Sequence, residues 1–214
     1  DPDNYDDAPR EGIRRLLEKI SSEPVPQEVP LENIEWIRMG TTVATNALLE
    51  KQGAETALLI TKGFKDLLRI GYQNRPELFN LNIQKTLPLY GKVIEIDERV
   101  LPKEEGFEVL KELDIASIQN ELLALKSTGI TSIAIVLLHA YQFFDHEKVL
   151  AALAREIGFE QVSVSHEVIP SLKAVVRGDT TVVDAYLTPH IKEYIYNFSV
   201  GFKSRLQNRP LLFM

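Results

Sequence analysis

The 214-residue chain contains no cysteine. Disulfide bonds, a cysteine nucleophile and thiolate metal sites are therefore excluded within it. This absence is in keeping with a reducing compartment, and we expect a cytoplasmic protein. The apolar runs are also short. The run from Ile133 to Leu138 is far below the roughly 20 residues that a membrane-spanning helix needs, and no signal-like apolar segment opens the chain.

Three common catalytic and nucleotide-binding motifs are also missing. The sequence has no G-x-x-x-x-G-K-[ST] phosphate loop, no G-x-G-x-x-G dinucleotide fingerprint and no G-x-S-x-G nucleophile elbow. Its four histidines do not show the i, i+4 pairing of a helical metal site, so we expect no metal site formed by them. We interpret each as a surface or core residue: His139, His146, His166 and His190.

Positive charge in excess is absent as well. The net charge of -7 gives no electrostatic reason to expect a nucleic acid or an anionic membrane as partner. Charged residues make up 26% and apolar residues 44% of the chain, which argues against long disorder and for a globular protein of one or two domains. The chain begins at Asp1 without methionine and ends on the strand-like run Leu211 to Met214, so we expect a piece of a longer protein.

What is present is an α/β pattern. Residues 56–61 and 131–138 are apolar without alternation, which is typical of parallel strands covered on both faces. Residues 93–100 alternate and predict a strand with one wetter face. Asp7, Asp114 and Asp145 are expected to cap helices, of which the last two end at Gly129 and Gly158. We therefore predict an α/β fold, a layered mixed or parallel sheet with flanking helices.

The expected domain organisation has three parts. Residues 1–30 form an N-terminal helix and linker, residues 31–178 form the α/β domain, and residues 179–214 form a long helix and the start of the next strand. Apolar residues keep one helical register across Pro189, so we expect a helix kinked there rather than ended.

The first candidate site is the turn that follows Trp36 to Met39. Gly40 lets the backbone approach a ligand, Thr41 and Thr42 offer cap hydroxyls, and unpaired N–H groups at a helix start suit an anion. The alternative is that Thr41 or Thr42 only caps a helix that ends at Gly53.

Two further polar segments are candidates. Asn74 and Arg75 lie in a long aperiodic loop, where functional residues concentrate, although they could equally be solvated loop residues. Arg177 and Thr180 are expected in a second polar turn before a helix, where an arginine could clamp a carboxylate. We expect the two turns to face a shared cavity for a small anion. The predicted substrate-binding residues are Gly40, Thr41, Thr42, Asn46, Asn74, Arg75, Arg177 and Thr180.

Several long segments also resemble one enzyme family. They include RMGTTVATNALL at 38–49, TKGFKDLLRIG at 61–71, NRPELF at 74–79, DPDNY at 1–5 with EGIRRLLE at 11–18, VIEIDERV at 93–100 and DAYLTP at 184–189. In this order they resemble the hydantoinase/oxoprolinase family, and most closely the N-terminal region of its eukaryotic ATP-dependent lactam-opening members. The resemblance covers nearly the whole chain.

The resemblance implies an enzyme that opens the lactam of 5-oxo-L-proline to L-glutamate while it cleaves ATP, within the actin-like ATPase superfamily and its hydantoinase A N-terminal domain type. It implies a divalent cation such as Mg²⁺, the substrate and the rest of the parent chain as partners, and a homodimeric parent. Family members have glycine-rich phosphate loops before and after the region matched here. We therefore expect the isolated chain to bind ATP weakly and to be inactive.

Two alternatives stay open at this point. A hydantoin-opening or ketone-carboxylating relative shares the turn motifs, and the chain could instead be a structural or interaction domain with catalysis elsewhere in the parent. The catalytic residues cannot be named from these patterns.

Overall fold

A computed structural model describes residues 7–32, 34–74, 79–83, 85–202, 206 and 209–213. The chain divides into two compact units, residues 1–51 with 190–214, and residues 52–189. We call them the terminal unit and the sheet unit. This division does not coincide with the expected boundaries at 30/31 and 178/179. The reason is that strand β1 (Ile37–Met39) pairs in parallel with β8 (Leu211–Phe213), which joins the two ends of the chain in one unit.

The sheet unit is built on four parallel strands in the order β3-β2-β6-β7. Their bounds are Lys92–Ile96, Thr56–Thr61, Ser132–Val136 and Gln161–Val164, respectively. Leu59 of the central strand β2 stands opposite Ile94 on one side and Ile135 on the other. The predicted α/β layered architecture is confirmed.

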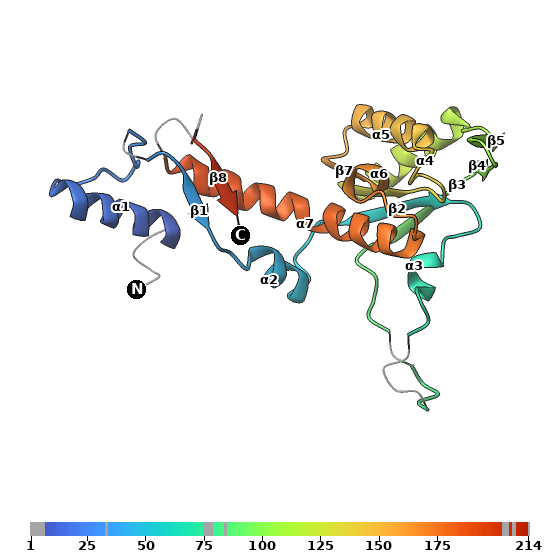
Figure 1. Cartoon of the computed structure of the whole chain (residues 1–214), viewed down its shortest axis with the longest axis horizontal. Helices are drawn as coiled ribbons and strands as arrows, with labels where there is room; N and C mark the ends of the chain where they lie inside the picture. The colour runs from blue at the N-terminus through green and yellow to red at the C-terminus, as the bar shows by residue number, and fades with distance from the viewer. Residues whose placement is uncertain are drawn as a thin grey trace. The chain divides into compact units, whose positions relative to one another are not determined.

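Helices cover both faces of this sheet, which explains its lack of polar alternation (Figure 1). On one face, α4 (Ile115–Ser127) and α5 (Asp145–Ile157) pack on alternate strand residues such as Leu59 and Ile135. On the other face, α3 (Leu67–Ile70) and the first part of α7 (Ala174–Val200) pack on Leu58 and Ile60. Residues Thr56–Thr61 are accordingly buried throughout.

The strand expected over residues 93–100 is instead two strands. β3 ends at Ile96, and β4 (Arg99–Pro102) forms an antiparallel hairpin with β5 (Phe107–Lys111). The break falls at Asp97 and Glu98, where the Glu98 side chain turns into the interior and is only 4% exposed. A buried carboxylate that needs donors breaks the alternation that predicted a continuous strand.

Helix α4 begins at the predicted cap, because the Asp114 carboxylate accepts a hydrogen bond of 3.1 Å from the Ser117 N–H. Asp114→Ala should therefore lower the free energy of unfolding by about 1 kcal/mol. Chemical denaturation of the chain measures this. Glu121→Ala, an exposed change in the middle of the same helix, is the control. Equal losses in the two variants would contradict the capping role.

The terminal unit contains α1 (Ala8–Ser21), β1, α2 (Val43–Leu49), the last part of α7 and β8. Asp7 caps α1 as predicted, since its carboxylate accepts a 2.7 Å hydrogen bond from the Arg10 N–H. The buried core of this unit is formed by apolar residues from the linker, β1, the end of α7 and the segment after it, namely Val29, Leu31, Ile37, Phe198, Phe202 and Leu206.

Gly53 does not end the helix that precedes it. Helix α2 ends at Leu49, and Lys51 takes the left-handed conformation with φ 57°. Gly53 is needed for close packing instead, since a Cβ atom there would lie 2.2 Å from the ring of the buried Tyr186. The expected helix end at Gly53 was wrong because a glycine required by a tertiary contact resembles a helix stop in sequence.

Helix α7 runs through Pro189, as the apolar register predicted. Proline has no N–H to donate to the carbonyl four residues earlier, which belongs to Ala185. The buried Ser132 hydroxyl, at the start of β6, donates a 2.6 Å hydrogen bond to that carbonyl. The sheet therefore supplies the hydrogen bond that the helix lacks at its proline.

Candidate functional site

The predicted turn at residues 40–46 lies in the terminal unit. The Thr41 hydroxyl accepts a 3.2 Å hydrogen bond from the Val43 N–H, while Thr42 makes no side-chain cap bond. Gly40, Thr42 and Asn46 are exposed. Helix α2 has only seven residues, so its dipole is short. Contact of these four residues with a substrate stays a prediction.

The second expected turn is not a turn. Arg177 and Thr180 lie within α7, which already begins at Ala174. The Thr180 hydroxyl donates a 2.9 Å hydrogen bond to the Val176 carbonyl, and the Thr181 hydroxyl does the same to Arg177 at 2.7 Å. These bonds satisfy the hydroxyls inside the helix, which is why a segment rich in Gly, Asp and Thr does not form a turn here.

Arg177 is completely buried, with an exposed fraction of 0%. Its Nη2 donates to the carbonyls of Leu137 and Leu138 at 2.7 and 2.9 Å. Its Nη1 donates to the Ser171 carbonyl, and its Nε donates to the Ser165 hydroxyl at 3.0 Å. Burial lowers the pKa of this guanidinium from its ordinary value. Arg177 therefore ties the end of β6 to α6 (Ser165–Val168) and α7, and its four bonds occupy it within the protein.

Glu147 is the anionic counterpart of Arg177, and its exposed fraction is also 0%. Its carboxylate accepts from the Leu137 N–H at 2.9 Å, the Ser165 hydroxyl at 2.6 Å and the His166 N–H at 3.1 Å, and His166 Nδ1 lies 2.7 Å away. Because Ser165 accepts from Arg177 and donates to Glu147, it links the two charges. We call Glu147, Ser165, His166 and Arg177 the carboxyl-edge network.

A second buried pair fills the neighbouring part of the same sheet edge. The Thr61 hydroxyl donates to Glu98 at 2.6 Å and accepts from the Leu138 N–H at 3.0 Å, and His146 Nδ1 lies 2.9 Å from Glu98. In open α/β sheets, ligands bind where neighbouring connections diverge, which here is between the ends of β2 and β6. In this chain the protein's own polar groups occupy that place.

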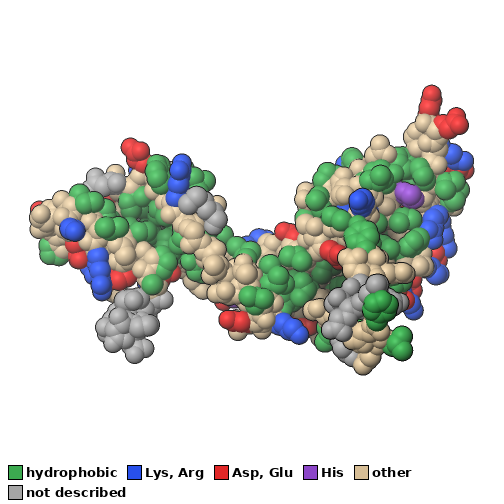
Figure 2. Space-filling view, turned by 60° about the horizontal axis from the view of Figure 1, so that its bottom comes forward, with side chains coloured by type: hydrophobic (Ala, Val, Ile, Leu, Met, Phe, Trp, Pro, Cys, Tyr) green, Lys and Arg blue, Asp and Glu red, His purple; other side chains and the backbone are tan. Residues whose placement is uncertain are grey.

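The histidines confirm part of the sequence interpretation. His146 is buried and His166 is half-buried, and each has a carboxylate partner. On the face seen in Figure 2 the histidine colour reaches the surface only as a small patch on the sheet unit. Sequence reasoning missed both pairs. The sequence pattern that could have indicated them is the adjacent His146 and Glu147 at the start of α5. This pattern is ambiguous, because acidic residues are common in the first turn of a helix, where they interact favourably with the helix dipole.

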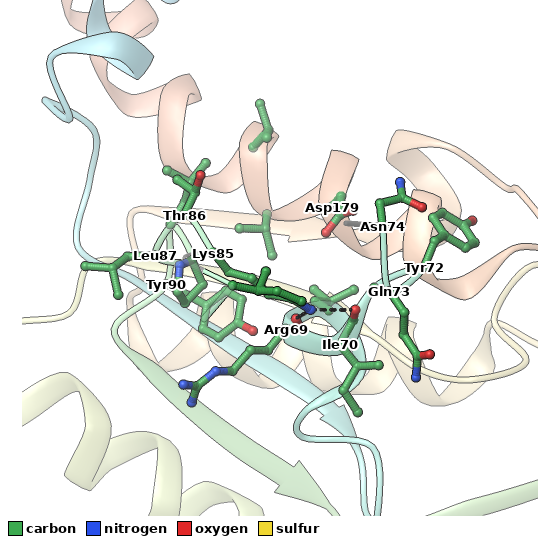
Figure 3. Close-up of a pocket in the computed structure, with 17 residues that line it drawn as sticks. Arg69, Ile70, Tyr72, Gln73, Asn74, Lys85, Thr86, Leu87, Tyr90 and Asp179 are labelled. Carbon is green, nitrogen blue, oxygen red and sulfur yellow. Dashed lines mark hydrogen bonds between the residues drawn. The ribbon is translucent and has the colours of Figure 1, made fainter. Parts of the chain in front are cut away.

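A cavity of about 450 Å³ opens in the sheet unit between α3, α7 and the segment before β3 (Figure 3). This volume is within the range of roughly 300–1,000 Å³ that is common for small-molecule sites. The predicted residue Asn74 lines it, whereas Arg177 and Thr180 are not among the described residues that do. Arg75 lies outside the described residues. The polar lining includes Arg69, Gln73, Asn74, Lys85, Thr86, Tyr90 and Asp179, and the apolar lining includes Leu68, Leu89, Val182 and Val183.

The charges at this cavity are of both signs. Lys85 donates from Nζ to the carbonyls of Arg69 and Ile70, both at 3.0 Å, at the end of α3. Partial burial raises the pKa of the Asp179 carboxyl. Burial, followed by the charges of Asp179 and Asp66, also raises the pKa of Tyr90. A site with a carboxylate, an ammonium and neutral amide and hydroxyl groups can orient a small polar molecule from several sides.

The cavity expected to be shared by the turn at Thr41 and the segment at Arg177 stays a prediction, because the two segments belong to different units. Arg177 itself is enclosed in the carboxyl-edge network and does not line the cavity of the sheet unit. The terminal unit has a groove of its own of about 530 Å³, lined mainly by apolar residues of α1 and β1. Of the helices in the described part of the chain, none combines the length and apolar character needed to cross a membrane.

Comparison with known proteins places this chain among larger enzymes. It is 47% identical to 5-oxoprolinase of Dictyostelium discoideum and 46% identical to 5-oxoprolinase of Saccharomyces cerevisiae, each over 100% of this chain. The chain spans about a fifth of the length of these curated relatives, since it covers 19% of each.

Two solved structures of other proteins resemble this chain in fold. An ATP-dependent caprolactamase from Pseudomonas jessenii has a TM-score of 0.79 and 26% identity, over 100% of this chain and 31% of that one. A nucleotide-free acetone carboxylase shares the fold, with a TM-score of 0.66 and 20% identity. The match covers 82% of this chain and 26% of the carboxylase chain. A family model described as the hydantoinase/oxoprolinase N-terminal region matches residues 3–158. The chain belongs to the hydantoinase/oxoprolinase family, as a representative of its N-terminal region.

Proposed function

We propose that this chain is the N-terminal region of an ATP-dependent 5-oxoprolinase. The parent protein would convert 5-oxo-L-proline, ATP and water into L-glutamate, ADP and phosphate. The observation that carries the proposal is identity of 46–47%, over the whole chain, to relatives named 5-oxoprolinase. The likeness to a caprolactamase, whose name denotes another cyclic amide, favours lactam opening over the hydantoin-opening and ketone-carboxylating alternatives.

The chemistry explains why such a reaction needs ATP. A lactam carbonyl is a poor electrophile because the ring nitrogen donates electron density to it. Transfer of the γ-phosphoryl group to the lactam oxygen activates the carbonyl carbon, and a first water adds there. The C–N bond then breaks, which frees the amine and leaves an acyl phosphate, and a second water hydrolyses this acyl phosphate to glutamate and phosphate. A protein site for this reaction must orient the ring and hold its carboxylate.

The cavity of the sheet unit is large enough for a small ring, which supports the proposal, but the described residues do not by themselves fit a nucleotide site. The sequence has no Walker-type phosphate loop. Among the described residues, no three His, Asp or Glu side chains are placed to hold a metal ion. The proposal therefore assigns ATP and a divalent cation such as Mg²⁺ to the parent protein, which we also propose to be a cytoplasmic homodimer. The isolated chain would be inactive.

A coupled assay tests the proposal. The full-length parent should release glutamate and phosphate in equal amounts from 5-oxo-L-proline and ATP, and should release little phosphate when the lactam is omitted. In isothermal titration calorimetry, the 214-residue chain alone should show no micromolar affinity for ATP. A parent that opens hydantoins or carboxylates ketones but not 5-oxo-L-proline would overturn the substrate assignment.

A further inference from the structure

The cavity next to α7 contains polar groups without partners beside an apolar wall. Asp179, Asn74 and Tyr90 line it; the first two are exposed to solvent and Tyr90 is half-buried. Within the described residues none of the three makes a hydrogen bond or ion pair from its side chain. Leu68, Val182 and Val183 supply apolar surface to the same hollow. Polar groups left free beside an apolar wall are typical of a site that holds a small molecule with a defined orientation.

Close packing of α3 on α7 fixes this geometry. A Cβ atom on Gly178 would lie 2.5 Å from Cδ2 of Leu68, so the glycine allows α3 to approach the helix directly beside Asp179. In Figure 3, Asp179 extends from α7 toward the hollow, with Asn74 on one side and Thr86 on the other. The position of Asp179 is therefore set by packed elements and not by a free loop.

Asp179 is also distinctive in charge. It is the one acidic side chain among the described residues that line the cavity. The facing ammonium of Lys85 already donates two hydrogen bonds to the end of α3, so the structure gives Asp179 no ion pair with it. An ionised carboxylate only accepts hydrogen bonds. A ligand group that contacts Asp179 there would have to be a donor, since the carboxylate would repel an anion.

We propose that Asp179 accepts the ring N–H of a cyclic amide and thereby selects lactams over lactones. The inference rests on the proposed function, because it takes the cavity as the binding site of the lactam. The ring methylenes would pack on Leu68, Val182 and Val183, and the substrate carboxylate would lie away from Asp179, on the side of Lys85. A hydrogen bond from the N–H to an anion also moves electron density onto the carbonyl oxygen, the atom that must attack phosphorus.

The surroundings of Asp179 strengthen such a bond. Partial burial already disfavours its charge and raises its pKa, and its charge contributes to the raised pKa of Tyr90. A ligand that covers the exposed Asp179 carboxylate would remove water from it, and a charge-assisted hydrogen bond is stronger there than in water. The charge-assisted bond requires the ionised carboxylate. KM for the lactam should therefore rise as the pH falls through the raised pKa of Asp179.

The test uses the full-length parent and two matched variants. Asp179→Asn should raise KM for 5-oxo-L-proline about 10- to 100-fold, because the amide oxygen can still accept but lacks the charge that strengthens the bond, and the amide N–H groups face a donor. Asp66→Asn is the control, because Asp66 begins α3 and also influences Tyr90 but does not line this cavity. It should leave KM within about twofold of wild type.

A lactone analogue distinguishes recognition from a structural effect. In 5-oxotetrahydrofuran-2-carboxylic acid the ring N–H is replaced by oxygen, so Asp179 would face an acceptor. Wild type should bind this lactone poorly as a competitive inhibitor. The amide of Asp179→Asn can donate to the ring oxygen, so in this variant the ratio of the lactone's Ki to the lactam's KM should be at least tenfold lower than in wild type. A merely structural role would weaken both ligands together and leave the ratio unchanged.

The outcomes separate the two proposals. If wild type opens the lactam with ATP and Asp179→Asn matches Asp66→Asn in KM and in the lactone ratio, the role of Asp179 is refuted while the proposed function stands. If wild type does not open 5-oxo-L-proline at all, the proposed function fails and this inference fails with it.

Discussion

Arg177→Met is expected to lower the free energy of unfolding of the sheet unit by about 3–5 kcal/mol. Methionine keeps an apolar stem of similar length but removes every donor. The carbonyls of Leu137 and Leu138 and the Ser165 hydroxyl would lose the hydrogen bonds that they accept from Arg177. Glu147, which is fully buried, would keep its charge without the positive charge linked to it through Ser165.

Hydrogen exchange of the backbone amides in β6 and β7 is the suitable measurement. The chain consists of two units, so a single melting temperature need not report on this network. Arg155→Met is the matched control, because Arg155 is half exposed and lies 3.8 Å from the exposed Glu167. It should cost less than about 1 kcal/mol. Similar protection in the two variants would show that the network does not stabilise the sheet edge.

A double mutant shows whether the buried charges act together. Glu147→Gln should also be strongly destabilising, because the amide cannot accept all the hydrogen bonds that reach the carboxylate. Combined with Arg177→Met it should cost at least about 1 kcal/mol less than the sum of the single changes, since both act through Ser165. Strict additivity would contradict the proposed link.

Ser132→Ala should lower the free energy of unfolding of the sheet unit by about 1–3 kcal/mol. The hydroxyl is fully buried and donates the 2.6 Å hydrogen bond to the carbonyl of Ala185. Without it, that carbonyl would have no donor, because Pro189 cannot provide the N–H that a helix normally places there.

The same change should be nearly neutral in a Pro189→Ala background. Alanine at position 189 restores a backbone N–H four residues after Ala185, so the helix itself can satisfy the carbonyl. Hydrogen exchange of α7 and β6 in the four proteins of this cycle measures the coupling. The idea fails if Ser132→Ala costs the same with proline and with alanine at position 189.

The elements that sequence predicted correctly depend on local chemistry. Asp7 and Asp114 cap their helices, and the unbroken apolar run 56–61 is a strand covered on both faces. Each of these patterns has one dominant physical explanation within a few residues. The resemblance to the hydantoinase/oxoprolinase family, which the comparisons confirm, likewise rests on several motifs in a fixed order.

The errors occurred where one residue type serves two purposes. Gly53 resembles a helix stop but accommodates the ring of Tyr186, and Arg177 resembles a substrate clamp but is buried among the protein's own acceptors. Glu98 interrupts a strand because its carboxylate is directed inward to Thr61. In each case the partner lies more than 30 residues away or in another element, so no local pattern contains it.

The sequence by itself determined the fold class, the helix caps at Asp7 and Asp114 and the family, because these follow from short-range periodicity, cap chemistry and ordered motifs. The cap expected at Asp145 was wrong, because α5 begins at that residue and Phe144 precedes it without a side-chain cap bond. Only the tertiary structure decided that Arg177 is buried among the protein's own acceptors, that Asp179 and Asn74 line one cavity, and that Ser132 completes the helix at Pro189. The physical reason is that burial and hydrogen-bond partners arise when distant segments pack. An arginine or an aspartate has the same side chain in a core and in a binding site, and its surroundings determine which role it has.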